Sequence, residues 1–99
     1  MVEQSVVEAI KKFVQAQGGK VIKFQGTVSQ EAGTPDLIGG LWGIPFMCEV
    51  KQPGDPHPLS PLQRVRINEW KAQGYVAIVA HSVLEFVSLM RIERYENED

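Results

Sequence analysis

Acidic and basic side chains between Pro35 and Lys51 have a spacing that suits phosphate chemistry. Pro35-Asp36 is followed, after twelve residues, by Glu49-Val50-Lys51. If the second segment is a strand, side chains two residues apart point to the same face, so Glu49 and Lys51 project together. Two carboxylates and one ammonium group at one point suit a hard divalent cation and an anionic phosphate.

These residue types match what magnesium-assisted hydrolysis of a phosphodiester requires. Asp36 and Glu49 can supply carboxylate ligands, and the carbonyl of Val50 can add a third oxygen. Lys51 can orient the attacking water or offset the negative charge that builds on the phosphate. Pro35 fixes φ and helps aim the Asp36 side chain toward Glu49.

The simplest alternative is an ion-pair cluster on the surface of a sheet. The strand would place Phe46, Cys48 and Val50 on one face and Met47, Glu49 and Lys51 on the other. Because the neighbours are apolar, the charged residues at the strand end should be partly buried, which is costly without a purpose. A hydrolase of small phosphoesters is disfavoured as well, because the chain has neither a Gly-rich phosphate loop nor clustered His ligands.

Length and composition limit the kind of protein. Ninety-nine residues with 43% hydrophobic content predict a single domain over residues 1–99. The net charge of −2 weighs against a protein that coats nucleic acid, but not against an enzyme. A single cysteine excludes an internal disulfide, and the absence of a leader or a long apolar run leads us to expect a cytoplasmic protein without a membrane partner. The acidic tail, residues 93–99, is expected to be frayed.

Periodicity and cap residues predict the order of elements, which is α-β-β-β-α-β-α. A Gly18-Gly19 stop and a Ser60-Pro61-Leu62-Gln63 helix start, with Gln63 able to complete a capping box, support two of the boundaries. Ser82 and Glu85 predict a second capping box. The expected helices are 3–17, 61–73 and 83–92; the expected strands are 21–24, 36–42 (weakened or bulged at Gly39-Gly40), 45–51 and 75–80. The fold class is therefore α/β, with a mixed sheet flanked by helices.

The motifs in this order resemble the PD-(D/E)xK nucleases, whose restriction-endonuclease-like core is α-β-β-β-α-β. More narrowly, the chain is similar to the stand-alone VRR-NUC domains of phage and bacteria, which are related to the nuclease domain of the Fanconi-associated nuclease. The resemblance covers about residues 3–86. It rests on Gly18-Gly19-Lys20-Val21, Lys23-Phe24, Gly33-Thr34-Pro35-Asp36, Glu49-Val50-Lys51, Leu59-Ser60-Pro61-Leu62-Gln63 and Gly74-Tyr75-Val76.

The resemblance implies a Mg²⁺- or Mn²⁺-dependent nuclease that acts as a homodimer on branched DNA, four-way junctions especially. It implies catalytic roles for Asp36, Glu49, Lys51 and Gln63. The metal would be held by Asp36, Glu49, the Val50 carbonyl and a glutamate of the first helix, for which Glu3 and Glu8 are both candidates. For Gln63, the capping box is an equally good explanation.

Basic residues around the motif are candidates for contacts with double-stranded or branched DNA. They are Lys51, His57, Arg64, Arg66 and Lys71. Ordinary surface charge is the favoured alternative for Arg66 and Lys71, and simple exposure is favoured for His57. A catalytically silent DNA- or protein-binding module on the same scaffold is the alternative function. The complete set of two acids and a lysine argues against it.

Overall fold

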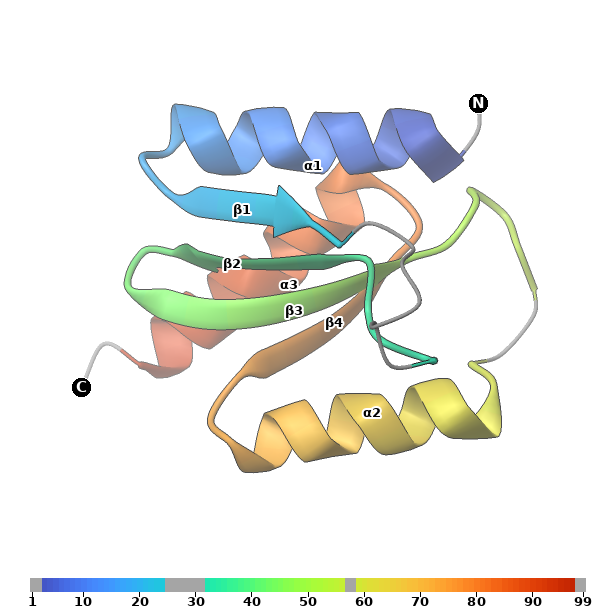
Figure 1. Ribbon diagram of the computed structural model, residues 1–99. Helices are drawn as coiled ribbons and strands as arrows, with labels where there is room; N and C mark the ends of the chain where they lie inside the picture. Colours follow the sequence, from blue (N-terminus) through green and yellow to red (C-terminus); the bar gives the residue numbers. More distant parts are fainter. Residues whose placement is uncertain (1–2, 25–31, 57–58, 98–99) are drawn as a thin grey trace.

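The computed structural model describes residues 3–24, 32–56 and 59–97. The elements are α1 (Glu3–Ala16), β1 (Lys20–Lys23), β2 (Leu37–Leu41), β3 (Ile44–Val50), α2 (Pro61–Ala72), β4 (Val76–Ala80) and α3 (Val83–Glu96) (Figure 1). This is the order predicted from the sequence. The described helices include none that is long and apolar enough to cross a membrane.

The four strands form one mixed sheet in the order β1-β2-β3-β4. The strands β1, β2 and β3 pair in antiparallel fashion, whereas β4 runs parallel to β3. A two-residue turn joins β2 to β3, with positive φ at both Trp42 (55°) and Gly43 (78°). Such a turn matches the twist of the strands that it connects. The mixed sheet flanked by helices confirms the predicted fold class.

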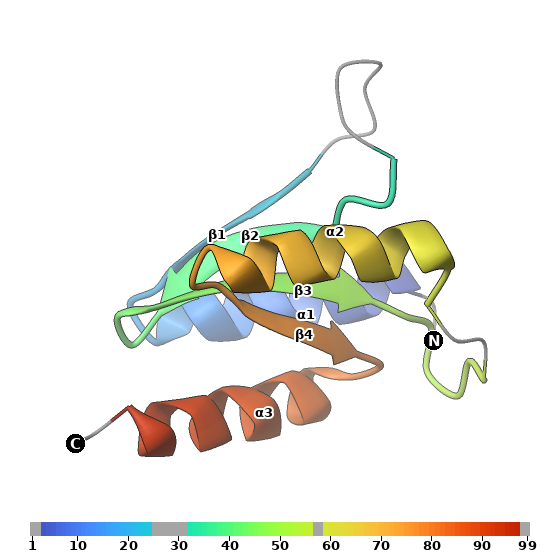
Figure 2. The same cartoon turned by 90° about the horizontal axis from the view of Figure 1, so that it is seen from below.

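The helices cover both faces of the sheet, and Figure 2 shows α2 and α3 on opposite sides. One hydrophobic core joins the sheet to α1 and α3, where the rings of Phe46 and Phe86 meet edge to face at 5.1 Å. The helix α2 contributes buried Ile67, which lies outside that core cluster. The main core therefore fills the α1 and α3 side, and α2 covers the other side.

The residues of β3 alternate between these two sides as predicted. Phe46, Cys48 and Val50 belong to the core cluster, whereas Met47 and Glu49 are buried outside it. Burial raises the pKa of the Cys48 thiol, which confirms Cys48 as a small buried hydrophobic residue and not a reactive one. The alternation sends Glu49 to the side that α2 covers.

The glycines of β2 do not interrupt the strand, so the predicted weakening or bulge is wrong. Pairing with both neighbours continues in register through Gly39 and Gly40. A Cβ at Gly39 would collide with the Lys20 carbonyl oxygen and press on the Phe46 ring. Glycine is needed there because β1 and Phe46 approach the backbone closely.

The last helix differs from its prediction at both ends. It continues through Glu96, beyond the predicted end at Ile92. At the start, Ser82 Oγ accepts a hydrogen bond from the amide of Glu85, as predicted. The Glu85 carboxylate instead accepts from the amide of His81 and contacts the His81 ring at 2.9 Å. The reciprocal half of the second capping box is therefore replaced by a contact one residue earlier.

The core argument predicts how two substitutions in α3 differ. Phe86 is 0% exposed and Leu84 is 72% exposed. We expect Phe86→Ala to lower the free energy of unfolding by about 3–5 kcal/mol, because it removes a ring from a packed core. Leu84→Ala should change it by less than about 0.5 kcal/mol. Urea unfolding followed by circular dichroism measures both values, and equal losses in the two variants would contradict this placement of the core.

Candidate active site

Glu49 is the only buried charged side chain among the described residues, at 7% exposure. Its Oε2 accepts a hydrogen bond from the amide nitrogen Nε2 of Gln63, at 3.1 Å. An ionised carboxylate in such a place loses hydration, and this cost is recovered only by hydrogen bonds or nearby positive charge. The burial of Glu49 therefore marks this face of β3 as the place to look for a site.

Asp36 lies immediately before β2 and is bonded to the end of β3. Its Oδ2 accepts a hydrogen bond of 2.8 Å from the amide of Val50, and its carbonyl accepts one of 2.9 Å from the amide of Phe24. The β2–β3 register ends with Leu37 opposite Cys48. Continuing this register by one residue puts Asp36 opposite Glu49, where directly opposed side chains share a face. The two predicted carboxylates are thus brought to one edge of the sheet.

Burial raises the pKa of the Asp36 carboxyl above its ordinary value of 3.8. The hydrogen bond from Val50 and the positive charges of Lys23 and Lys51 act in the opposite direction without cancelling the effect of burial. The carboxylate is therefore short of compensating charge.

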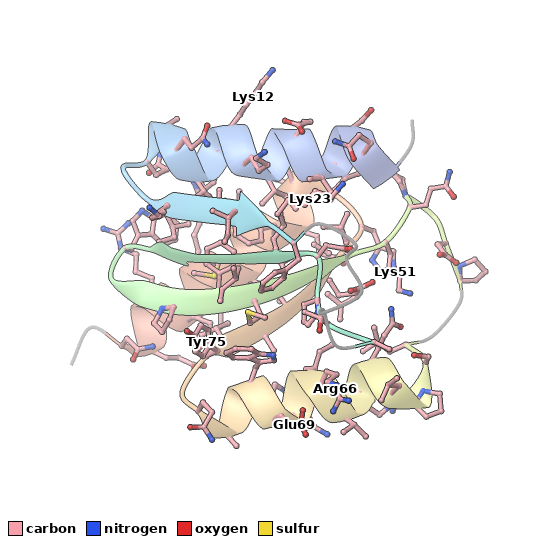
Figure 3. All side chains as sticks on the ribbon, in the orientation of Figure 1. Lys12, Lys23, Lys51, Arg66, Glu69 and Tyr75 are labelled. Carbon is pink, nitrogen blue, oxygen red and sulfur yellow. The ribbon has the colours of Figure 1, made fainter. Side chains whose placement is uncertain are left out.

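Lys51 follows β3 directly, and its backbone amide is bonded to the carbonyl of Ala80 at 2.9 Å. The strand alternation puts its side chain on the same face as Glu49. Within the described residues, its ammonium group makes no hydrogen bond or ion pair, and it lies near enough to Asp36 to influence that pKa. Figure 3 shows Lys51 at the sheet edge where β3 ends. The group is available to a substrate.

Gln63 forms the predicted capping box and also contacts the buried Glu49. Its Oε1 accepts from the amide of Ser60 at 2.9 Å, while its backbone amide donates to Ser60 Oγ at 3.1 Å. This is a complete capping box. The remaining amide nitrogen is then directed to Glu49. The helix cap therefore fixes the side chain that orients the buried carboxylate.

Sequence reasoning missed Lys23 and Gln4. Lys23 Nζ donates to Gln4 Oε1 at 2.9 Å and lowers the pKa of Asp36, and it lies at the same edge of the sheet as Lys51 (Figure 3). The signal that could have found Lys23 is its place at the end of β1, next to the start of β2. Gln4 had no such signal, because it belongs to the site only through the packing of α1.

The structure describes the side chain of only one of the two first-helix glutamates that were candidates for a metal ligand. Glu8 is exposed and is bonded to Gln4 at 3.1 Å, with Lys11 at 4.0 Å. It does not join Asp36 and Glu49, since no three acidic, His or Cys side chains gather as a metal site in the described part of the chain. Glu3 is the first residue of α1, and its side chain lies outside the described part.

The predicted DNA-contact residues are dispersed. Arg64 and Lys71 are exposed on α2, two turns apart and on the same side of the helix. Arg66 is instead engaged by Ala32 and Glu69. His57 lies outside the described residues.

Comparisons with known proteins bear on the fold of the chain. No family model matches the chain, and no curated protein matches it. Solved structures do match it, and two of them show the extent of the similarity. A "VRR_NUC domain" superposes with a TM-score of 0.74 at 27% identity, over 90% of this chain and 94% of the other. A "VRR_NUC domain protein" has a TM-score of 0.71 at 22% identity, over 92% of this chain and 86% of the other.

The chain is therefore similar in fold to VRR-NUC domains, the family that its motifs resemble. The sheet with its three helices matches the fold of these structures.

The raised pKa of Asp36 predicts an effect on the stability of the metal-free protein. A carboxyl with a raised folded-state pKa binds protons more tightly in the folded chain, so its contribution is lost as pH rises from about 3.8 through that raised pKa. The side chain introduced by Asp36→Asn does not titrate, and its oxygen can still accept the Val50 hydrogen bond. We therefore expect Asp36→Asn to be more stable than the parent at pH 7, with a smaller difference near pH 4.

Thermal unfolding of both proteins in a metal chelator measures this difference at the two pH values. Glu93→Gln, which removes a carboxylate from the last turns of α3, serves as the control for loss of one negative charge. A stability difference between Asp36→Asn and the parent that is the same at both pH values would contradict the assigned cost of burying this carboxylate.

Proposed function

We propose that this chain is a Mg²⁺- or Mn²⁺-dependent DNA endonuclease that hydrolyses phosphodiester bonds. The observation that carries the proposal is the hydrogen bond from the Val50 amide to Asp36. It fastens one carboxylate to the strand end that holds Glu49 and Lys51. Two partly or fully buried acids and one available ammonium group are thereby collected at the edge of the sheet.

The donor atoms at this edge suit a hard cation. Asp36 and Glu49 offer carboxylate oxygens, and both are desolvated. In a strand, the carbonyl of a residue points to the same side as its amide, so the Val50 carbonyl should also point toward Asp36. An all-oxygen set of this kind is what Mg²⁺ and Mn²⁺ prefer. Glu3 remains our candidate for a further ligand. When bound, the cation would polarise the phosphate and acidify a water.

The other side chains supply positioning and charge. Gln63 holds the Glu49 carboxylate in one orientation, because its own amide is fixed by the cap of α2. Lys51 is free to orient the attacking water or to bind the phosphate oxygen on which negative charge develops. Catalysis by this set would therefore rest on groups that are already in place before the substrate arrives.

Exposed basic residues extend the site along α2. Arg64 and Lys71 project from the same side of the helix and would bind backbone phosphates beside the site. His57, in the proline-rich segment after the motif, is a further candidate for a DNA contact. The net charge of −2 means that binding must depend on this local distribution of charge, not on the charge of the whole protein.

The branched nature of the DNA and the homodimer follow from the family resemblance. A four-way junction presents two symmetric strands, and a dimer with twofold symmetry presents two sites to them. A chain of 11.1 kDa is small for a substrate with four arms, which favours the use of two copies.

Cleavage of a fluorescent four-way junction in the presence of Mg²⁺ or Mn²⁺ tests the proposed activity. We expect a chelator to abolish nicking. Lys51→Ala should slow it by about 100-fold or more, because removal of one preorganised charge-stabilising group typically costs that much. Junction binding in the chelator, measured by fluorescence anisotropy, should remain within a few-fold of the parent.

Lys12→Ala is the matched control, because Lys12 is exposed on α1 and points away from the sheet (Figure 3). It should cut at the parental rate. Undiminished cleavage by Lys51→Ala would show that the assigned mechanism is wrong. Binding of junction DNA with no cleavage in either metal would instead establish the catalytically silent module.

Sedimentation equilibrium with and without the junction tests the homodimer. We expect two 11.1 kDa chains for each junction. A complex that contains one chain and is fully active would exclude the two-site arrangement, while leaving the nuclease assignment intact. A linear duplex of the same sequence, cut at the same rate as the junction, would exclude the preference for branched DNA.

A further inference from the structure

We propose that Arg66 is a positioning residue, which keeps Asp36 in register with Glu49 by binding the segment before Asp36 to α2. The consequence for metal binding rests on the proposed function. The positioning of the carboxylate itself does not, because it concerns the metal-free protein.

The contacts of Arg66 lie at the surface and connect α2 to this segment. Its Nε donates to the carbonyl of Ala32 at 3.2 Å, across 34 residues of sequence. Its Nη1 donates to the Glu69 carboxylate at 3.1 Å, one turn further along α2. The side chain is 23% exposed. Arg66 and Glu69 lie together on α2 (Figure 3), and Nε of Arg66 binds the carbonyl four residues before Asp36.

Gly33 lets the same segment lie directly on the first turn of α2. It has φ of +82°, and a Cβ there would be 3.0 Å from the carbonyl carbon and Cγ of Leu62. The next residue but one, Pro35, is fully buried and has a fixed φ. The chain between Ala32 and Asp36 is therefore held by a hydrogen bond at one end, by close packing, and by the Val50 hydrogen bond at the other end.

Side chains of one helix, α2, therefore contact Glu49 and the segment before Asp36. Gln63 and Arg66 are three residues apart and neighbours on the helix surface. Gln63 reaches Glu49, and Arg66 reaches the segment that carries Asp36. The helix α2 therefore supports both acids from one side, in addition to the Val50 hydrogen bond that joins Asp36 to β3. Groups of this kind commonly change metal affinity 10- to 100-fold when removed.

A direct phosphate contact is the competing role for Arg66. Arg64 meets the requirements for that role better, since it is exposed and is not bonded to another side chain among the described residues. The two arginines should therefore fail in different ways. Loss of Arg66 should disturb Asp36, whereas loss of Arg64 should weaken DNA binding only.

The backbone amide of Val50 reports on Asp36 in the metal-free protein, because Asp36 is its acceptor. We expect Arg66→Met to move the Val50 amide signal upfield in a ¹⁵N-correlated NMR spectrum and to speed its hydrogen exchange about tenfold. The Lys51 amide, which is bonded to Ala80 in the sheet, is the internal control and should keep its exchange rate. Equal acceleration of both amides would mean general fraying of β3 and would overturn the proposal.

Calorimetric titration with Mn²⁺ gives the second readout. Arg66→Met should bind about 10- to 100-fold more weakly than the parent. Arg66→Lys keeps the charge but loses the Nε donor, so it should show the same direction of change and also serves if Arg66→Met does not fold. Arg64→Met should retain Mn²⁺ affinity and lose affinity for the junction.

The possible results distinguish the positioning role of Arg66 from the proposed metal site. Unchanged Val50 exchange and Mn²⁺ affinity in folded Arg66→Met and Arg66→Lys, with weaker DNA binding, would make Arg66 a phosphate contact and overturn the proposal. Failure of the parent to bind Mn²⁺ would refute the proposed metal site, while the Val50 amide would still decide whether Arg66 positions Asp36.

Discussion

The hydrogen bond between the Val50 amide and Asp36 is the contact on which the candidate site depends. The pairing between β2 and β3 ends where Leu37 lies opposite Cys48. The amide of Val50, two residues further along β3, therefore has no backbone acceptor on the β2 side. A buried amide without an acceptor is costly, and the Asp36 carboxylate removes that cost. The same bond fixes Asp36 beside the strand end that carries Glu49 and Lys51. The same hydrogen bond therefore completes the backbone bonding of β3 and positions a carboxylate of the candidate site.

The topology of the sheet explains why α2 begins near Glu49 and contacts it. Because β3 and β4 are parallel, the chain must cross from the end of one strand to the start of the other. This crossover starts at the C-terminal end of β3, where Glu49 and Lys51 lie. It returns along the face of the sheet opposite the core. The first turn of the crossover helix must therefore begin near that end of β3. Gln63, the third residue of α2, reaches Glu49 for this reason. The capping box that starts the helix also immobilises the side chain.

What the sequence predicted depended on local rules. Alternation placed Glu49 on the face opposite Cys48, and the Ser60-Pro61 start located α2, because both depend on neighbours within a few residues. The roles of Lys23, Gln4 and Arg66 arise from contacts between elements that are distant in sequence, and no local pattern marks them. Gly39 shows the opposite error: a glycine expected to weaken the strand is required by close packing against Phe46.

The formal charge at this edge would depend on whether a metal ion is bound. Two carboxylates, Asp36 and Glu49, are set against two lysines, Lys23 and Lys51, so the formal charge is near zero when the acids are ionised. A neutral cluster does not attract DNA over a distance. A divalent cation held by the acids would give the edge a charge of about +2, and the phosphate backbone would then be drawn to this edge of a protein whose net charge is −2. On this argument, the carboxylates confer metal dependence on DNA attraction as well as on hydrolysis.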